Sequence, residues 1–193
     1  MHISDAQLEM RTRFVGGFYG QLVSGVLWLV SAALAAWSTP RAAIIAIVVG
    51  GFFIFPLTTL LLRLAGERSS LSPDNTLYQL GAQVALVLPL SMPLLLPVAR
   101  YRLTLFFPAL MVLVGAHYLP FVFLYGMRMF GVLTAALVAG GILIARFLPG
   151  SFGAGAWYGG VVLLVFAVVG RMSVSRERRT TATAGQISSL AAS

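Results

Sequence analysis

The sequence predicts an all-α membrane protein, a bundle of six transmembrane helices preceded by a short amphipathic N-terminal helix. Three observations lead to this fold class. Hydrophobic residues make up 59% of the chain and charged residues only 9%, whereas a soluble domain carries about a quarter charged residues. Six apolar runs approach or exceed the ~20 residues that cross a bilayer as a helix. The runs also lack the alternation at period two that is typical of a membrane β-barrel.

Each apolar run is predicted to be a helix because backbone polar groups cannot stay unpaired in lipid. The predicted spans are residues 14–37, 42–62, 77–98, 103–127, 129–148 and 152–170, which together form a transmembrane domain over residues 14–171. Thr39 is expected to cap the second span, whose next residue is Pro40.

The two ends of the chain have different compositions. Residues 1–13 are predicted to form an interfacial amphipathic helix, in which Ser4 and Gln7 have the spacing of a capping box. A cleaved signal peptide ending near Ala33–Ala35 is a weaker alternative, because the leader is acidic and the apolar run is long. Residues 172–193 are predicted to be a disordered cytoplasmic tail because most of them are small and polar.

The fourth and fifth spans are separated by almost no polar sequence. Residues 103–148 as a single helix would be about 69 Å long at 1.5 Å per residue, which is more than one bilayer crossing. We therefore expect the chain to reverse within YGMRMFG (125–131), where Gly126 and Gly131 supply turn freedom and Arg128 is the one charge.

The basic residues predict the orientation. All thirteen are arginine. With six spans and a cytoplasmic amino terminus, nine arginines fall on the inner side and four on the outer side, as the positive-inside rule requires. The inner set is Arg11, Arg13, Arg63, Arg68, Arg128, Arg171, Arg176, Arg178 and Arg179. We expect a multi-pass protein of the bacterial inner (cell) membrane with both termini cytoplasmic. Membrane lipids are its expected partners, and nucleic acid is not, because these arginines stand at the ends of apolar runs.

Several function classes lack the residues that they need. Cysteine and lysine are absent, which excludes thiolate metal sites and Schiff-base chemistry. The sequence has no phosphate-binding loop, no HExxH motif, no nucleophile elbow and no paired carboxylates. We therefore expect no catalytic residue, no metal and no cofactor, and an enzyme is the least favoured class.

His117 is the best candidate site residue, since it is the one ionisable side chain near the middle of a span. The residues expected to line a polar pocket with it are Tyr118, Phe121, Tyr125, Arg128 and Gln83. In the alternative interpretation His117 only holds helices together through a hydrogen bond, for example to Gln83, Thr58 or Tyr19.

Prolines are expected to shape the helices around this site. Pro120 should kink the fourth span and free the carbonyl of Ala116 beside His117. Pro89, Pro93 and Pro97 repeat at every fourth residue, so the outer half of the third span is predicted to be bent or unwound, or to end early as an irregular segment. Pro56 stands in the second span, next to threonines 58 and 59.

Small residues form faces that favour close helix approach. They are Gly16, Gly17, Gly20 and Ser24 in the first span, Gly140 and Gly141 in the fifth, and Gly155, Gly159 and Gly160 in the sixth. A homodimer through these glycine-rich faces is the expected assembly.

Four segments carry a resemblance to a known group of proteins. They are SDAQLEMR (4–11), FPLTTLLLR (55–63), FFPALM (106–111) and GAHYLPFVFLYGMR (115–128). With these segments the chain resembles a family of small uncharacterised bacterial integral membrane proteins that is defined only as a domain of unknown function. The resemblance implies no activity, substrate or cofactor.

Three functional hypotheses remain open at this point. In the first, the bundle binds or moves a small molecule or lipid in an intramembrane polar pocket around His117. In the second, the chain is an interaction or scaffold protein whose polar residues only fix helix packing. In the third, it is a membrane enzyme that relies on His117 and the tyrosines.

Overall fold

The computed structural model describes residues 1–67 and 71–191, with side chains through residue 180. Arg68 and the last two residues of the predicted tail lie outside the described residues. Every regular element in the described part of the chain is helical. Six helical segments in it are long and apolar enough to cross a membrane. This confirms the predicted fold class, a transmembrane helix bundle with a short N-terminal helix, and makes the chain a multi-pass membrane protein.

The spans contain short 3-10 turns as well as α-helices. In chain order the elements are α1 (Ile3–Arg13), η1 (Val15–Gly17), α2 (Phe18–Trp37), α3 (Pro40–Leu64), α4 (Leu77–Ser91), η2 (Met92–Leu94), α5 (Leu95–Tyr101), η3 (Leu103–Leu105), α6 (Phe106–Tyr118), α7 (Phe121–Tyr125), α8 (Met129–Phe147) and α9 (Ala154–Ala191). Thr39 caps α3 as predicted, because its hydroxyl oxygen accepts a hydrogen bond from the amide of Ala42 at 3.1 Å.

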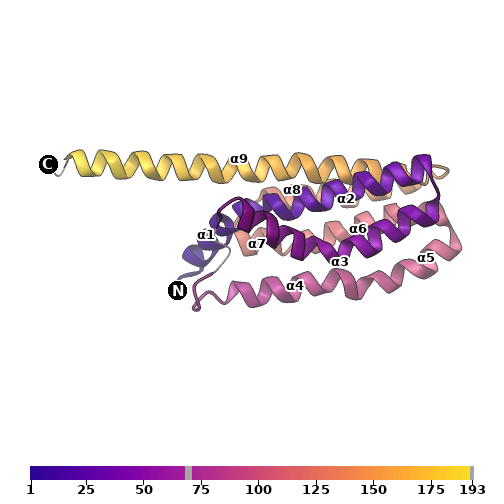
Figure 1. Cartoon of the computed structure of the whole chain (residues 1–193), viewed down its shortest axis with the longest axis horizontal. Helices are drawn as coiled ribbons and strands as arrows, with labels where there is room; N and C mark the ends of the chain where they lie inside the picture. The colour runs from indigo at the N-terminus through magenta and orange to yellow at the C-terminus, as the bar shows by residue number, and fades with distance from the viewer. Residues whose placement is uncertain (68–70, 192–193) are drawn as a thin grey trace.

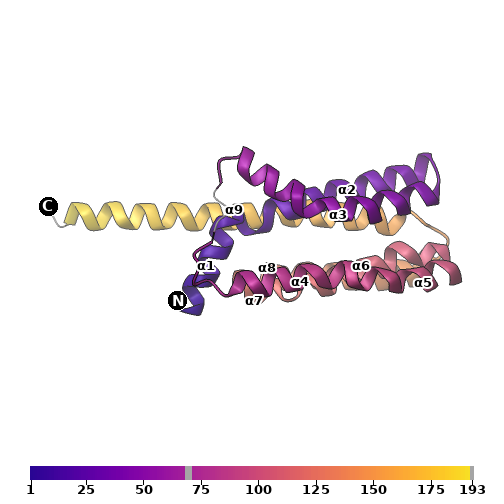
Figure 2. The same cartoon turned by 60° about the horizontal axis from the view of Figure 1, so that its bottom comes forward.

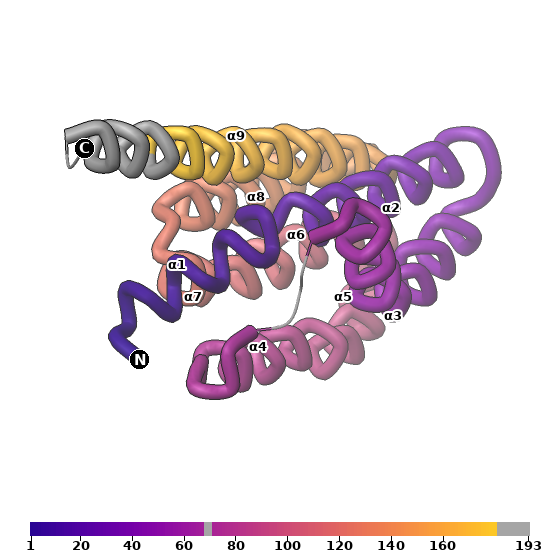
Figure 3. Tube along the Cα trace, turned by 60° about the vertical axis from the view of Figure 1, so that its left-hand side comes forward, coloured from indigo at the N-terminus to yellow at the C-terminus, as the bar shows by residue number. Residues whose placement is uncertain are grey.

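The spans run along the long axis of the molecule in two layers (Figures 1 and 2). One layer contains α2, α3 and α9, and the other contains α4 to α8. Both termini lie at the same end of the bundle, which we call the α1 end (Figure 1). Viewed obliquely to the bundle axis, α3 and α4 occupy separate edges: α3 packs on α2, and α4 packs on α6 (Figure 3).

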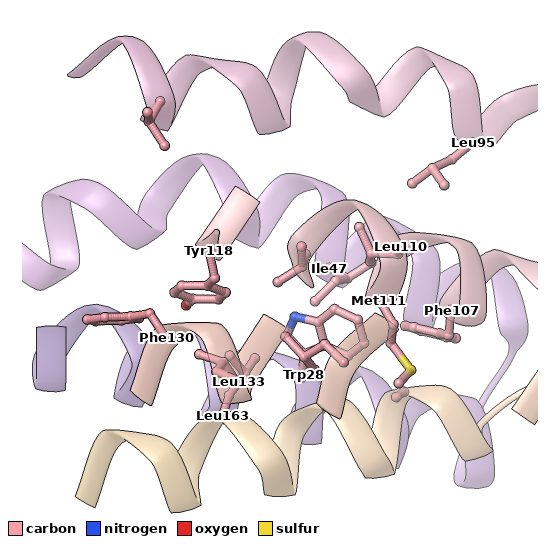
Figure 4. Packing of buried hydrophobic residues seen from close by; sticks show 14 of the residues in the cluster. Trp28, Ile47, Leu95, Phe107, Leu110, Met111, Tyr118, Phe130, Leu133 and Leu163 are labelled. Atoms are coloured by element: carbon pink, nitrogen blue, oxygen red, sulfur yellow. The ribbon is translucent and has the colours of Figure 1, made fainter. Parts of the chain in front are cut away.

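The buried core lies between the two layers. Figure 4 shows Trp28, Phe107, Met111, Tyr118, Phe130, Leu133 and Leu163 gathered there. In contrast, α3 and α4 expose long apolar side chains, including Phe52 and Phe55 at 68% and Leu90 at 76%. Such surfaces suit contact with lipid chains.

The glycine-rich faces make contacts within the chain. A Cβ on Gly160 would lie 3.1 Å from the backbone nitrogen of Leu29, and one on Gly141 would lie 2.7 Å from the carbonyl oxygen of Pro108. Glycine therefore allows α2 to pack on α9 and α6 to pack on α8. Most of the glycines of these faces are buried inside one protomer.

The reversal between the fourth and fifth spans lies at Gly126–Arg128. Gly126 has a φ of +63°, in the left-handed region that favours glycine. Gly131 does not contribute to the turn, as it lies inside α8.

The triple-proline segment stays helical. After Ser91 the chain passes through one 3-10 turn, η2, and continues as α5 to Tyr101. The 3-10 turn places proline where the missing amide costs little, so the segment bends without unwinding. The prediction of an irregular outer segment was therefore wrong.

Helix α1 crosses the end of the bundle and joins α2 through a sharp elbow at Val15–Gly17 (Figure 2). The three elbow residues have φ values of +52°, +62° and +80°. Val15 is the one non-glycine residue with positive φ among the described residues, and such a β-branched residue is strained there. The elbow brings Gly16 against the carbonyl of Gly170 on α9.

Helix α9 extends well past the other helices at the α1 end (Figure 1). It does not stop near Gly170, where the sixth span was predicted to end, but remains helical through Ala191. The structure therefore shows helix over most of the segment that was predicted to be disordered. The segment also contains alanine, arginine, glutamate and leucine, which have high helix propensity and which the compositional argument overlooked.

Candidate functional site

Four of the predicted site residues meet in one aromatic cluster. The rings of His117 and Phe121 have centroids 5.3 Å apart, and those of Phe121 and Tyr125 stack at 5.6 Å. Tyr118 stacks on Phe130 of α8 at 6.1 Å (Figure 4). Tyr118 and Tyr125 are 7% and 6% exposed, so these rings fill space between α6, α7 and α8. The structure brings these four predicted residues together as a cluster of rings in mutual contact.

The other two predicted site residues lie elsewhere. Gln83 is exposed on the outer face of α4, because the next residue, Val84, takes the inward position. Arg128 is exposed at the turn before α8. Arg128 was grouped with His117 by helical spacing, and Gln83 was included as a polar residue of another span. Neither argument fixes which face of a helix meets its neighbours.

His117 contacts α4 through the backbone. Its ring donates a hydrogen bond to the carbonyl of Val84. Its Nδ1 atom is buried and has no hydrogen-bond partner in the described part of the chain. The expected side-chain partners, Gln83, Thr58 and Tyr19, do not take that role in the described structure. A neutral imidazole that donates from Nε2 carries a lone pair on Nδ1, so His117 offers a buried acceptor.

Pro120 separates α6 from α7, as predicted, but it does not create the expected free carbonyl. The amide of Leu119 donates to the carbonyl of Ala116 at 3.2 Å, and the amide of Val122 donates to that of Leu119 at 3.1 Å. The chain tightens into i+3 bonding around the proline and so satisfies Ala116. A polar notch made by that carbonyl is therefore ruled out.

Two further polar side chains lie about as far from the α1 end of the bundle as His117 does. Their polar atoms have no hydrogen-bond partner among the described residues. Gln21 on α2 is 1% exposed, and neither its amide nitrogen nor its amide oxygen has a partner among the described residues. The same holds for the buried hydroxyl of Thr58 on α3. Each of the three residues stands six to eight positions from the α1 end of its span, or roughly 9–12 Å at 1.5 Å per residue. We call Gln21, Thr58 and His117 the polar layer.

The direction in which Gln21 points follows from the contacts of a neighbouring residue on the same face of α2. Ser24 lies one turn away on the same face of α2. The hydroxyls of Ser24 and Tyr118 share a hydrogen bond. Gln21 therefore lies on the face of α2 that turns toward Tyr118. The sequence held a signal for it: Gln21, Ser24 and Ser31 form a polar stripe at helical spacing.

Three other intramembrane polar groups are satisfied, whereas the buried hydroxyl of Thr104, near the opposite end of the fourth span, also has no partner among the described residues. Ser31 donates to the carbonyl of Ala43 at 3.2 Å, which ties α2 to α3. Thr134 donates to the carbonyl of Gly115 at 3.0 Å, and Tyr158 donates to that of Ala136 at 3.2 Å. These residues fix helix packing. The polar layer differs from them because its hydrogen-bonding atoms are unused within the described residues.

Helix α1 is held on the end of the bundle by polar contacts with three elements. Gln7 donates to the carbonyl of Phe123 at 2.6 Å, so it does not form the predicted capping box. The guanidinium of Arg11 pairs with the carboxylate of Glu177 on α9. The carboxylate of Glu9 accepts from Ser72 at 2.7 Å and from Asn75 at 2.9 Å. The predicted interfacial helix is thus docked against the protein, with Ala6 and Met10 buried.

An open hollow of about 630 Å³ lies between α1 and α9, outside the polar layer. Its lining residues are Asp5, Leu8, Glu9, Thr12, Arg13, Val174, Glu177 and Arg178. Three of its charged groups are already engaged, since Glu9 and Glu177 hold α1 and Arg178 pairs with Glu67 at 3.3 Å. The hollow therefore marks the docking seam of α1.

Lowering the pH is expected to loosen α1. Hydrogen bonds from Asn75 and Ser72 hold the pKa of Glu9 below its ordinary value of 4.5. Because the folded pKa is the lower one, ionised Glu9 stabilises the docked helix above the unfolded pKa, and this contribution is lost as pH falls through the folded pKa. A spin label on Leu8→Cys, in a chain with no other cysteine, should gain mobility as the pH falls below the ordinary pKa of glutamate.

Asn75→Ala is the control for this prediction. Removing the amide raises the pKa of Glu9 toward its ordinary value, so the mobility transition should move to higher pH. An unchanged midpoint in Asn75→Ala would mean that another group governs the docking.

The comparisons with known proteins bear on family membership. Residues 3–173 match the family of unknown function DUF7010. No curated protein matches the chain, and no solved structure matches it. The match covers helix α1, the first five spans and the sixth span as far as residue 173, including the four segments in which the resemblance was seen. The chain belongs to DUF7010, a family of unknown function.

Proposed function

We propose that this protein binds, and moves within the membrane, a small amphipathic molecule or lipid whose polar group completes the hydrogen bonds of the polar layer around His117. One observation carries the proposal. Three polar groups from α2, α3 and α6 lie buried at a similar depth with unused donors and acceptors within the described residues, while Ser31, Thr134 and Tyr158 are paired. An unsatisfied polar group in a low-dielectric core is costly, so its retention supports a ligand role.

Helix α4 provides the side that would open. Of its fifteen residues only Leu77 and Val84 are buried, and Val84 carries the carbonyl that His117 contacts. The proline-rich η2 turn follows at the far end of α4. A helix held by so few buried side chains, next to a proline-rich bend, is suited to move and admit a ligand from the lipid.

A scaffold role is the second candidate, and the packed aromatic cluster favours it. If the polar residues only fix packing, the rings of Tyr118, Phe121 and Tyr125 serve as core side chains. The satisfied hydrogen bonds of Thr134 and Tyr158 agree with such a role, but the unused atoms of the polar layer do not.

We also propose that the α1 end faces the cytoplasm of a bacterial cell, with the protein in the inner membrane. The arginine distribution supports this orientation, since the α1 end carries the larger set. The exposed Trp37 and Tyr101, near the ends of spans at the opposite end, suit the other interface.

His117→Ala is expected to reduce bound ligand at least tenfold, because it removes the imidazole acceptor from the polar layer. The protein is purified in mild detergent from the membranes in which it is expressed. Native mass spectrometry then measures the small molecules and lipids that remain on it.

Tyr158→Phe is the matched control, since it removes a polar atom that is already paired with Ala136. This variant should keep the parental ligand. If His117→Ala retains the same bound species as the parent but melts at lower temperature, the scaffold role is correct and the binding proposal fails.

A further inference from the structure

We infer that Gln21 recognises the ligand, and that the ligand is an uncharged amphiphile whose head group places a hydrogen-bond donor beside an acceptor. The inference rests on the proposed function and names the chemistry of its ligand. Gln21 is 99% buried, and both atoms of its amide are without a partner in the described part of the chain. A primary amide presents a donor and an acceptor side by side, so its best complement is another amide or a protonated carboxyl group.

The surroundings of Gln21 select for an uncharged head. The buried polar residues in the described structure are Gln21, Ser24, Ser31 and Asn75, and none carries a charge. An ionised head would therefore lie in a low-dielectric region without a counter-charge, which is prohibitive. A neutral amide avoids that cost.

Thr58 supplies a second hydrogen-bonding group to the same head. It stands on α3 across from Gly20, the residue before Gln21, and a Cβ on Gly20 would lie 3.9 Å from the Thr58 hydroxyl. That hydroxyl is buried and has no partner among the described residues. Thr58 therefore offers a further hydrogen-bonding group beside the segment of α2 that carries Gln21.

The tail of the ligand is assigned from the exposed faces nearby. Helices α3 and α4 lie at separate edges of the bundle (Figure 3). They expose apolar side chains such as Phe55 and Leu86. A head held at Gln21 and Thr58 would leave its alkyl chain on this lipid-facing side. The ligand class is therefore a long-chain amide or a chemically equivalent neutral lipid.

Competitive photolabelling tests the inference. Full-length protein in nanodiscs is labelled with a diazirine-bearing fatty amide, in competition with oleamide or with methyl oleate, which has no donor. Cleavage at Arg13 and Arg41 releases α2 as one peptide for mass spectrometry. Oleamide should block labelling of this peptide about tenfold better than the ester, because the ester cannot donate to Gln21.

Two variants decide the result. Gln21→Leu should abolish the preference for amide over ester, and Ser31→Ala, which alters a paired residue on the same helix, should keep it. Thr58→Val, which leaves Gln21 in place, should reduce the preference in part and replaces Gln21→Leu if that variant does not fold.

The outcomes separate the inference from the proposed function. Equal competition by amide and ester in the parent overturns the head-group assignment, as does a preference that survives in Gln21→Leu. If label is still found on the peptide of residues 103–128, which contains His117, binding in the bundle stands while the ligand class is wrong. Absence of label from both peptides overturns the inference and the proposed function together.

Discussion

Replacing Gly16 with alanine is expected to lower the free energy of unfolding by about 2–5 kcal/mol. Gly16 has a φ of +62°, and a Cβ placed there would lie 2.8 Å from the carbonyl oxygen of Gly170 and 3.1 Å from the Cγ2 of Val174. The new methyl group would be strained by its own backbone and would meet a main-chain atom that cannot rotate away. Denaturation in SDS, followed by tryptophan fluorescence, measures the change.

Two glycine variants resolve this effect into its parts. Gly170→Ala adds a methyl group to the same contact, 2.8 Å from the carbonyl oxygen of Gly16, without a positive φ, so its smaller loss isolates the steric part. Gly51→Ala is the neutral control, since a Cβ there has no atom within 4 Å among the described residues. It should leave stability unchanged or raise it by up to about 1 kcal/mol through helix propensity. If Gly16→Ala and the parent are equally stable, the elbow at Val15–Gly17 does not approach the backbone of α9 at Gly170 as closely as the structure shows.

The membrane spans could be predicted from the sequence because lipid imposes a strong local constraint. A long run of apolar residues is stable in a bilayer as an α-helix. Thr39 and Gly126 mark the ends of spans through a helix cap and a left-handed turn. The docking of α1 could not be predicted in the same way. Its contacts join Glu9 to Asn75 and Arg11 to Glu177, which are distant in the sequence. Local patterns contain no information on such pairs.

The candidate site was predicted only in part, for a related reason. Spacing along one helix groups His117 with Phe121 and Tyr125, and the structure keeps them together. Spacing does not reveal which face of a second helix turns inward, so Gln83 was included although Val84 occupies the inward position. Gln21 was missed because a glutamine near the start of a span is ordinary in sequence. It becomes unusual once both of its polar atoms are buried without a partner in the described residues.

Replacing Gln21 with leucine is expected to raise the free energy of unfolding of the ligand-free protein by about 1–2 kcal/mol. The two side chains are similar in size and in helix propensity. Leucine has no polar atoms to desolvate, whereas the glutamine amide is 99% buried with no partner in the described part of the chain. Denaturation in SDS after removal of lipid measures the change. A gain in stability on losing a polar group is the opposite of what a packing residue would show.

Ser31→Ala gives the comparison that makes this result decisive. It removes the hydrogen bond from Ser31 to the carbonyl of Ala43 on α3, so it should lower stability by about 0.5–1 kcal/mol. If Gln21→Leu also lowers stability, its amide is satisfied in the native protein and serves packing. If Gln21→Leu is more stable and Ser31→Ala less stable, the chain retains a destabilising amide at Gln21. Retention of such a group is characteristic of residues kept for function, because a residue that binds a ligand is retained even when it lowers the stability of the folded protein.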